Sequence, residues 1–212
     1  MQPTMLIALP GGRECTAGVT LGQSRELAVI LPGLNYGCER PLLAGVTGLL
    51  QAQGADIVAL NFSYNTDTEF LAMPDAAKLA RIKEDGSAIV EHCLGLSDYR
   101  SLTVVGKSLG TVSMAGLAGH NLPDKTRMIW LTPSLTGTGL LAAMAGFDCP
   151  MYSVIGSCDL SVEITRGADY QNIAGLSHLE VAGMDHGWEH VDGMQAAQAG
   201  LAQAMVGLRD WM

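Results

Sequence analysis

Ser108 lies at the centre of Gly106-Lys107-Ser108-Leu109-Gly110, between an apolar run and a segment with a helical pattern. The G-x-S-x-G spacing suits a serine on a sharp strand-to-helix turn, because the helix passes so close to the strand that only small residues fit two positions before and after the serine. Such a turn lifts the hydroxyl above the sheet and directs free N–H groups of the helix N-terminus at a developing oxyanion. The pattern therefore predicts a nucleophile for acyl transfer.

The same stretch allows two other interpretations. Gly106-Lys107-Ser108 matches the end of a phosphate-binding P-loop, but that motif needs a glycine where this chain has Ser101, and residues 102–105 have the pattern of a strand. A plain glycine turn in which Ser108 caps a helix stays open on these residues alone.

His186 is the first candidate for a general base. It lies between a predicted strand at 179–181 and the last predicted helix, where an imidazole can reach a serine across the edge of the sheet. Asp159 follows the predicted strand at 151–155, and its carboxylate could orient that imidazole or cap a helix. Ser108, Asp159 and His186 thus occur in the order nucleophile, acid, base, which favours a Ser-His-Asp triad. Weaker candidates for the acid or the base are Asp148, Glu163, Asp169 and His190.

A second turn follows the apolar run at 27–31. Gly33, in Pro32-Gly33-Leu34, would let the main chain approach a substrate closely. The N–H of Leu34 would then point at the substrate carbonyl together with the N–H of Leu109, so that the two form an oxyanion hole. An ordinary Pro-Gly turn is the alternative.

Strand and helix patterns alternate along the chain with short gaps between them. Short apolar runs closed by turn residues are typical of strands buried on both faces, and longer segments with one polar side are typical of helices packed on a sheet. The alternation predicts an α/β fold in one domain over residues 1–212, with a doubly wound, mostly parallel sheet flanked by helices. The predicted strands are 5–9, 15–21 (the return strand of a hairpin), 27–31, 57–60 continuing to 64, 102–105, 128–131, 151–155 and 179–181, and the predicted helices are 41–53, 74–94, 109–120, 139–146 and 192–212.

The composition limits the class of protein and its partners. Hydrophobic residues make up 48% of the chain and charged residues 16%, which excludes a disordered protein. A net charge of −9 with dispersed Lys and Arg argues against nucleic-acid or membrane-surface binding. No apolar run reaches the roughly 18 residues of a membrane span and no signal segment is evident, so we expect a cytoplasmic protein. The five widely spaced cysteines predict reduced packing residues, without a disulfide framework or a metal site.

On these residues the chain resembles the α/β-hydrolase superfamily over nearly its whole length. The small size and the Pro-Gly loop resemble uncapped members, such as dienelactone-hydrolase-like and small carboxylesterase-like proteins. Pro32 stands where many relatives have His, and Lys107 stands where an aromatic residue, His or Gln is more usual. The resemblance implies acyl transfer through an acyl-enzyme on Ser108, with His186 as base and no cofactor. The matching stretches are Leu31-Pro32-Gly33, Gly106-Lys107-Ser108-Leu109-Gly110, Gly156-Ser157-Cys158-Asp159 and Asp185-His186-Gly187.

The substrate site is expected to be open. Only residues 132–136 separate the strand ending at Leu131 from the next helical segment, whereas relatives with lids carry long insertions there. A minimal or absent lid suits a small ester, thioester or related acyl compound as the partner molecule. Lys107 could favour an anionic substrate or could point to solvent. The side chains expected at this site are Asn35, Tyr36, Lys107 and Trp188, with packing as the alternative for the aromatic ones.

Two rival functions fit parts of the sequence. His186-Gly187-Trp188-Glu189-His190 matches the H-x-x-E-H motif of zinc peptidases, which requires both histidines on one face of a helix. Gly187, directly after a strand and a turn, argues against that helix. The other rival is a catalytically inert scaffold of the same fold, used for binding or signalling, and the complete set of nucleophile, acid and base argues against it.

Overall fold

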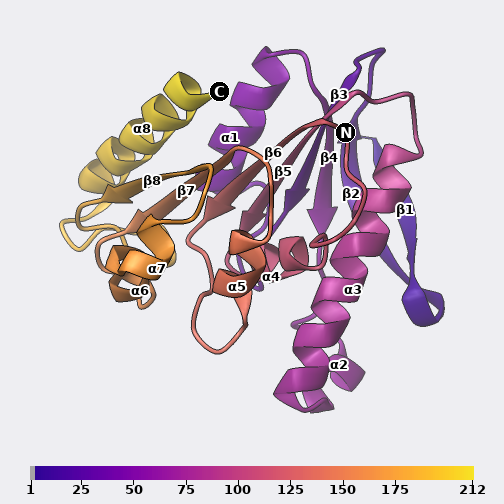
Figure 1. Ribbon diagram of the computed structural model, residues 1–212, viewed down its shortest axis with the longest axis horizontal. Helices are drawn as coiled ribbons and strands as arrows, with labels where there is room; N and C mark the ends of the chain where they lie inside the picture. The colour runs from indigo at the N-terminus through magenta and orange to yellow at the C-terminus, as the bar shows by residue number, and fades with distance from the viewer. Residues whose placement is uncertain (1–2) are drawn as a thin grey trace.

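In the computed structural model, which describes residues 3–212, eight strands form one sheet in the order β1-β2-β4-β3-β5-β6-β7-β8 (Figure 1). β2 pairs antiparallel with β1 and with β4, and all the other neighbours are parallel. The predicted α/β fold with a mostly parallel sheet and an N-terminal hairpin is confirmed. The strands are β1 (Thr4–Leu9), β2 (Arg13–Thr20), β3 (Glu26–Leu31), β4 (Asp56–Asn61), β5 (Ser101–Lys107), β6 (Lys125–Leu131), β7 (Met151–Gly156) and β8 (Leu176–Val181).

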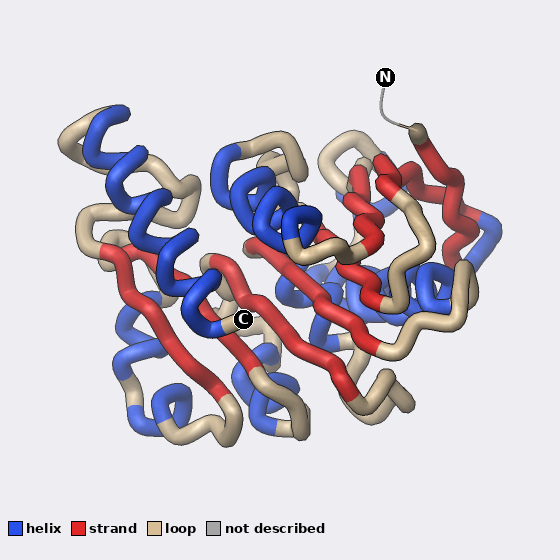
Figure 2. Tube along the Cα trace, turned by 90° about the horizontal axis from the view of Figure 1, so that it is seen from above, coloured by secondary structure: helices blue, strands red, loops and turns tan. Residues whose placement is uncertain are grey.

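Helices cover both faces of the sheet, as Figure 2 shows from above. α1 and α8 pack together on one face, and α3 and α4 pack together on the other. The apolar side chains of each central strand point alternately to these two layers, which is why the strands read as continuous apolar runs. The helices are α1 (Pro41–Ala52), α2 (Thr68–Ala72), α3 (Asp75–Leu94), α4 (Leu109–Ala115), α5 (Leu140–Ala145), α6 (Val162–Arg166), α7 (Ala168–Gln171) and α8 (Met194–Trp211), with a short 3-10 turn at Pro10–Gly12.

The structure corrects the prediction in three places. β4 ends at Asn61 instead of continuing to residue 64, because Tyr64 turns inward and is buried. α4 ends at Ala115 instead of residue 120, and Gly119 in the following turns has a φ of 81°, which a helix cannot accommodate. The short helices α2, α6 and α7 were not predicted, since one or two turns carry no clear period.

The parallel strands bring distant turns to one edge of the sheet. Leu31 at the end of β3 pairs with Gly106 near the end of β5, and Gly156 at the end of β7 pairs with Val181 at the end of β8. The turns after these four strands therefore meet at the carboxyl edge, where open α/β sheets bind ligands. Within residues 3–212, none of the helices combines the length and apolar character needed to cross a membrane.

Candidate active site

Ser108 directly follows β5 and precedes α4, and its backbone has a φ of 52° and a ψ of −113°. A positive φ is rare for a residue other than glycine and marks a tight, strained turn. The glycines on either side permit it: a Cβ at Gly110 would overlap the main-chain carbonyl of Leu31, and a Cβ at Gly106 would overlap the main chain of Gly110. The Ser108 N–H donates to the Leu131 carbonyl at 3.0 Å, which fixes the turn to β6. The G-x-S-x-G stretch thus forms the predicted sharp turn.

The structure brings Ser108, His186 and Asp159 into one hydrogen-bonded chain. Ser108 Oγ lies 2.7 Å from His186 Nε2, and His186 Nδ1 lies 2.7 Å from Asp159 Oδ2. Because an ionised carboxylate only accepts hydrogen bonds, a neutral His186 carries its proton on Nδ1 and leaves Nε2 to accept from the serine hydroxyl. The chain therefore runs from a buried charge to a hydroxyl through a ring that can take up a proton.

Of the two roles considered for Asp159, the structure places its carboxylate against the imidazole of His186, and it does not cap α6. Its side chain is fully buried, with one oxygen on His186 and the other accepting the Ser161 N–H at 2.8 Å just before α6. The His186 side chain is 39% exposed, so this hydrogen-bonded network is buried at Asp159 and reaches solvent at His186. Two fixed donors hold the carboxylate in place and so fix the orientation of the ring.

Main-chain donors were expected from the loop after β3 and from the start of α4. The Gly33 N–H donates to the Tyr36 carbonyl at 3.0 Å, which closes the loop after β3 into a tight turn. A Cβ at Gly33 would lie 3.4 Å from the Cβ of Ser108, so this loop passes close to the serine. In the described part of the chain, the N–H groups of Leu34 and Leu109 donate to no protein acceptor. They are therefore available to a bound oxyanion.

Three of the four side chains expected to contact substrate are buried. Tyr36 and Trp188 are each 5% exposed and Lys107 is 2% exposed, so they pack within the framework of the site and Lys107 does not point to solvent. Tyr36 accepts the Leu42 N–H on its hydroxyl at 3.0 Å, which occupies its polar end. Asn35 alone among the four is exposed. Substrate contact by the buried three stays a prediction, because sequence position does not reveal the direction of a side chain.

Ser134 is a neighbour of Ser108 that was not predicted from the sequence. Its Oγ lies 3.5 Å from Ser108 Oγ, and its N–H donates to Thr111 Oγ1 at 3.2 Å. It lies in the loop after β6, at the same edge of the sheet as the other site residues. Its position after a parallel strand is therefore the sequence signal that could have identified it. With Thr136, Asp159, Leu160, Ser161 and His186, it lines a cavity of about 230 Å³.

The H-x-x-E-H stretch does not form a helix. Asp185 accepts the Glu189 N–H on its side chain at 2.8 Å, and the Trp188 N–H donates to the Asp185 carbonyl at 3.1 Å, so residues 185–189 form a tight turn. His186 and His190 therefore do not share a helix face, and the geometry of the zinc-peptidase motif is not met.

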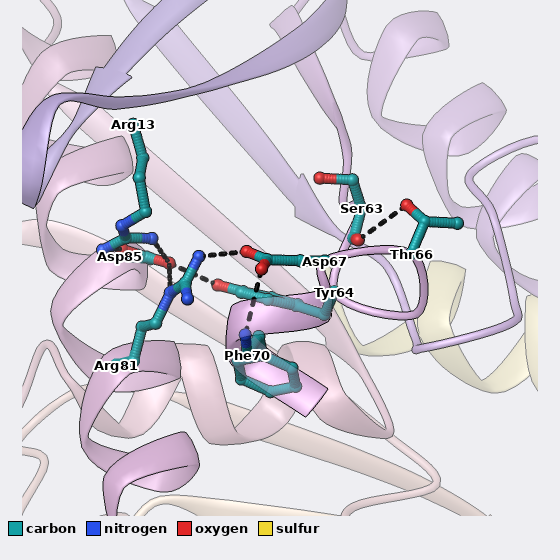
Figure 3. Close-up of polar contacts among 8 residues, drawn as sticks. All are labelled: Arg13, Ser63, Tyr64, Thr66, Asp67, Phe70, Arg81 and Asp85. Carbon is teal, nitrogen blue, oxygen red and sulfur yellow. Dashed lines mark hydrogen bonds and ion pairs between the residues drawn. The ribbon is translucent and has the colours of Figure 1, made fainter. Parts of the chain in front are cut away.

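A second buried polar network lies at the same end of the sheet, between β2 and α3 (Figure 3). Arg13 makes two hydrogen bonds of 2.7 Å to Asp85, whose side chain is fully buried. Tyr64 donates to the same carboxylate at 2.8 Å, and Arg81 forms an ion pair with Asp67. The network fixes the loop after β4.

Comparisons with known proteins show which fold the chain has. No family model matches the sequence, and no curated relative matches it. Among solved structures, an α-β serine hydrolase homologue from Coxiella burnetii has a TM-score of 0.72 at 16% identity, covering 99% of this chain and 95% of that one. The chain has the α/β-hydrolase fold.

Two further structures with the α/β-hydrolase fold align as fully. Est1E from Butyrivibrio proteoclasticus has a TM-score of 0.72 at 12% identity and covers 98% of each chain. The esterase Pf2001 from Pyrococcus furiosus has a TM-score of 0.71 at 12% identity, covering 100% of this chain and 91% of that one. In this chain Ser108 follows the central strand β5 and His186 follows the last strand, β8.

Proposed function

We propose that this protein is a serine hydrolase that cleaves a small ester, thioester or related acyl bond. The observation that carries the proposal is the unbroken chain of two 2.7 Å hydrogen bonds from Asp159 through His186 to Ser108. It ends on a strained turn at the edge of the sheet where this fold binds ligands, beside a cavity.

The reaction follows from the geometry in two acyl-transfer steps. His186 Nε2 takes the proton of Ser108 as Oγ attacks the substrate carbonyl carbon, and Asp159 stabilises the imidazolium that results. The Leu34 and Leu109 N–H groups bind the oxyanion of the tetrahedral intermediate, each contributing about 3 kcal/mol. The imidazolium then gives its proton to the leaving group. Water, deprotonated by His186, hydrolyses the acyl-enzyme and regenerates Ser108.

The cavity supports a small substrate. Its volume of about 230 Å³ is below the usual size of a pocket for a drug-sized ligand. Its lining combines the hydroxyls of Ser134, Thr136 and Ser161 with the side chain of Leu160. The connection between β6 and α5 is short, so it adds no lid over this cavity. The partner is therefore a small acyl compound.

The experiment combines covalent labelling with an ester screen. A fluorophosphonate probe is expected to label wild type and Ser97→Ala equally, because Ser97 is exposed in the turn before β5, and to leave Ser108→Ala unlabelled. In a series of p-nitrophenyl esters of graded acyl length, short acyl chains should be hydrolysed fastest, and Ser108→Ala should reduce the rate to background. A wild-type protein that neither reacts with the probe nor turns over any ester would contradict the proposal and favour an inert scaffold.

A further inference from the structure

Lys107 connects two loops that carry parts of the site. It is the last residue of β5, immediately before Ser108, and its side chain is almost fully buried. Its Nζ donates to the main-chain carbonyl of His186 at 2.7 Å, and the same atom lies 4.4 Å from the centre of the Tyr36 ring. His186 belongs to the loop after β8, and Tyr36 closes the loop that carries the Leu34 N–H.

These contacts are stronger when the amine is protonated. A hydrogen bond from an ammonium group is about twice as strong as one between neutral groups, and an aromatic face attracts a cation but not a neutral amine. The Lys107 stem also packs on the loop after β3 that carries Leu34 (residues 32–36, called the oxyanion loop from here on), since a Cβ at Gly33 would lie 3.3 Å from Lys107 Cδ. One charged side chain therefore holds the His186 loop after β8 and the oxyanion loop against β5, the strand that precedes the serine.

The surroundings of Lys107 bring the pKa of its amine into the pH range of ordinary buffers. Burial lowers the pKa of Lys107 to about 8, against the carboxylates of Asp159 and Asp185, which favour the cation. Arg40, in the loop after β3, opposes the cation. The charged groups that influence Lys107 thus come from the loops after β7, β8 and β3, and Tyr36 is the ring beneath it.

We propose that Lys107 is a positioning residue: its ammonium group holds the His186 and Leu34 loops in the geometry for attack by Ser108, and loss of its proton slows that attack. This inference rests on the proposed hydrolase function. Because the pKa lies near 8, Lys107 is a cation below that pH and an amine above it. The rate of attack should therefore fall as the pH rises through about 8, with Ser108, His186 and Asp159 all intact.

The test uses two substitutions and one control. Lys107→Met keeps an unbranched side chain without a donor, and Lys107→Gln restores a neutral donor. Lys83→Met is the matched control, because Lys83 Nζ also donates to a loop carbonyl, that of Thr138 at 3.3 Å, without touching the His186 or Leu34 loop. The rate of fluorophosphonate labelling of Ser108 and the kcat and KM for p-nitrophenyl acetate are measured between about pH 6 and pH 10.

A displaced reactive group can cost up to about 100-fold in rate, so Lys107→Met should label about 10- to 100-fold more slowly than wild type at pH 7. Its rate should no longer fall above about pH 8, and kcat should change more than KM. Lys107→Gln should be intermediate at pH 7 and should also lack the alkaline fall. Lys83→Met should follow wild type at every pH.

Four outcomes separate the inference from the proposed function. Wild type that is not labelled at all contradicts the proposed function, and this inference with it. Wild type that is labelled at a rate independent of pH above 7 contradicts the inference alone, as does a Lys107→Gln profile that keeps the alkaline fall. Lys107→Met labelling at the wild-type rate also overturns it. If Lys107→Met does not fold, judged by circular dichroism, the wild-type and Lys107→Gln profiles decide.

Discussion

Asp159 and Asp85 are both aspartates with fully buried side chains, and each accepts hydrogen bonds on both oxygens, yet their networks differ in kind. Asp159 faces an imidazole, a ring that can accept and donate a proton. Asp85 faces the Arg13 guanidinium, which stays protonated, and the Tyr64 hydroxyl, whose pKa is raised by burial and by the carboxylate itself. One network can move a proton, and the other can only hold charges in place.

The two networks also end differently. The Asp159 network ends on the Ser108 hydroxyl beside a cavity, whereas the Asp85 network ends on side chains that fix the loop after β4. A hydrogen bond of 3.0 Å between Asn65 and Asn35 connects that loop to the oxyanion loop. A buried aspartate is therefore no sign of a catalytic site by itself. Its partner and the route from that partner to solvent decide its role.

The largest expected effect tests whether the first network acts as a unit. His186→Ala and Ser108→Ala should each lower kcat by about a million-fold, because either change ends nucleophilic attack. The double variant should be no slower than either single one. Measurement of kcat for the three variants with a p-nitrophenyl ester checks this. Multiplication of the two effects in the double variant would show that the residues do not act together.

Asp159→Asn keeps the shape of the side chain and changes the proton arrangement of His186. An amide can donate to Nδ1, which places the imidazole proton on Nε2 and removes the acceptor for the Ser108 hydroxyl, so kcat should fall about ten-thousand-fold. Asp169→Asn, on α7, is the control and should behave as wild type. A loss of only a few-fold in Asp159→Asn would mean that another carboxylate is the acid.

Asp85→Asn should show the opposite profile. It leaves the Arg13 guanidinium without its buried charged partner, so the free energy of unfolding should fall by about 3–5 kcal/mol, measured in urea. The labelling rate of the folded fraction should change little. Asp210→Asn, which breaks an exposed ion pair with Arg209, is the control and should cost less than about 1 kcal/mol. A stable but inactive Asp85→Asn protein would contradict the assignment of the Asp85 network to stability alone.

The smallest expected effect concerns the stability of the fold at acidic pH. The Phe70 N–H and the Arg81 guanidinium hold the pKa of Asp67 below its usual value. A carboxyl with a lowered pKa in the folded state stabilises the fold above its usual pKa of about 3.9, and that contribution is lost as the pH falls through the lowered value. Asp67→Asn should therefore make Tm less dependent on pH below about pH 4, as thermal denaturation would show. An unchanged slope would exclude this contribution.

The sequence predicted the eight strands and the longer helices and singled out three residues that the structure brings together, because both follow local patterns. Ser108, Asp159 and His186 each come after a strand, and parallel strands place the turns at their carboxyl ends along one edge of the sheet. The directions of Tyr36, Lys107 and Trp188 could not be predicted, because burial at the site depends on the loops that pack over them. The Arg13–Asp85 pair joins residues 72 positions apart and has no local pattern at all.

The pairing of Leu31 with Gly106 has a consequence for heating. These two paired residues lie on adjacent strands, whose backbones are about 4.8 Å apart. The serine turn begins within two residues of Gly106 and the oxyanion loop within two residues of Leu31. The hydrogen bonds between the two strands therefore set the separation of the turn and the loop. Ladders in the middle of a sheet open only when the whole domain opens. Ser108 and the loop after β3 should therefore keep their spacing until the protein unfolds, and thermal inactivation should coincide with the melting of the sheet.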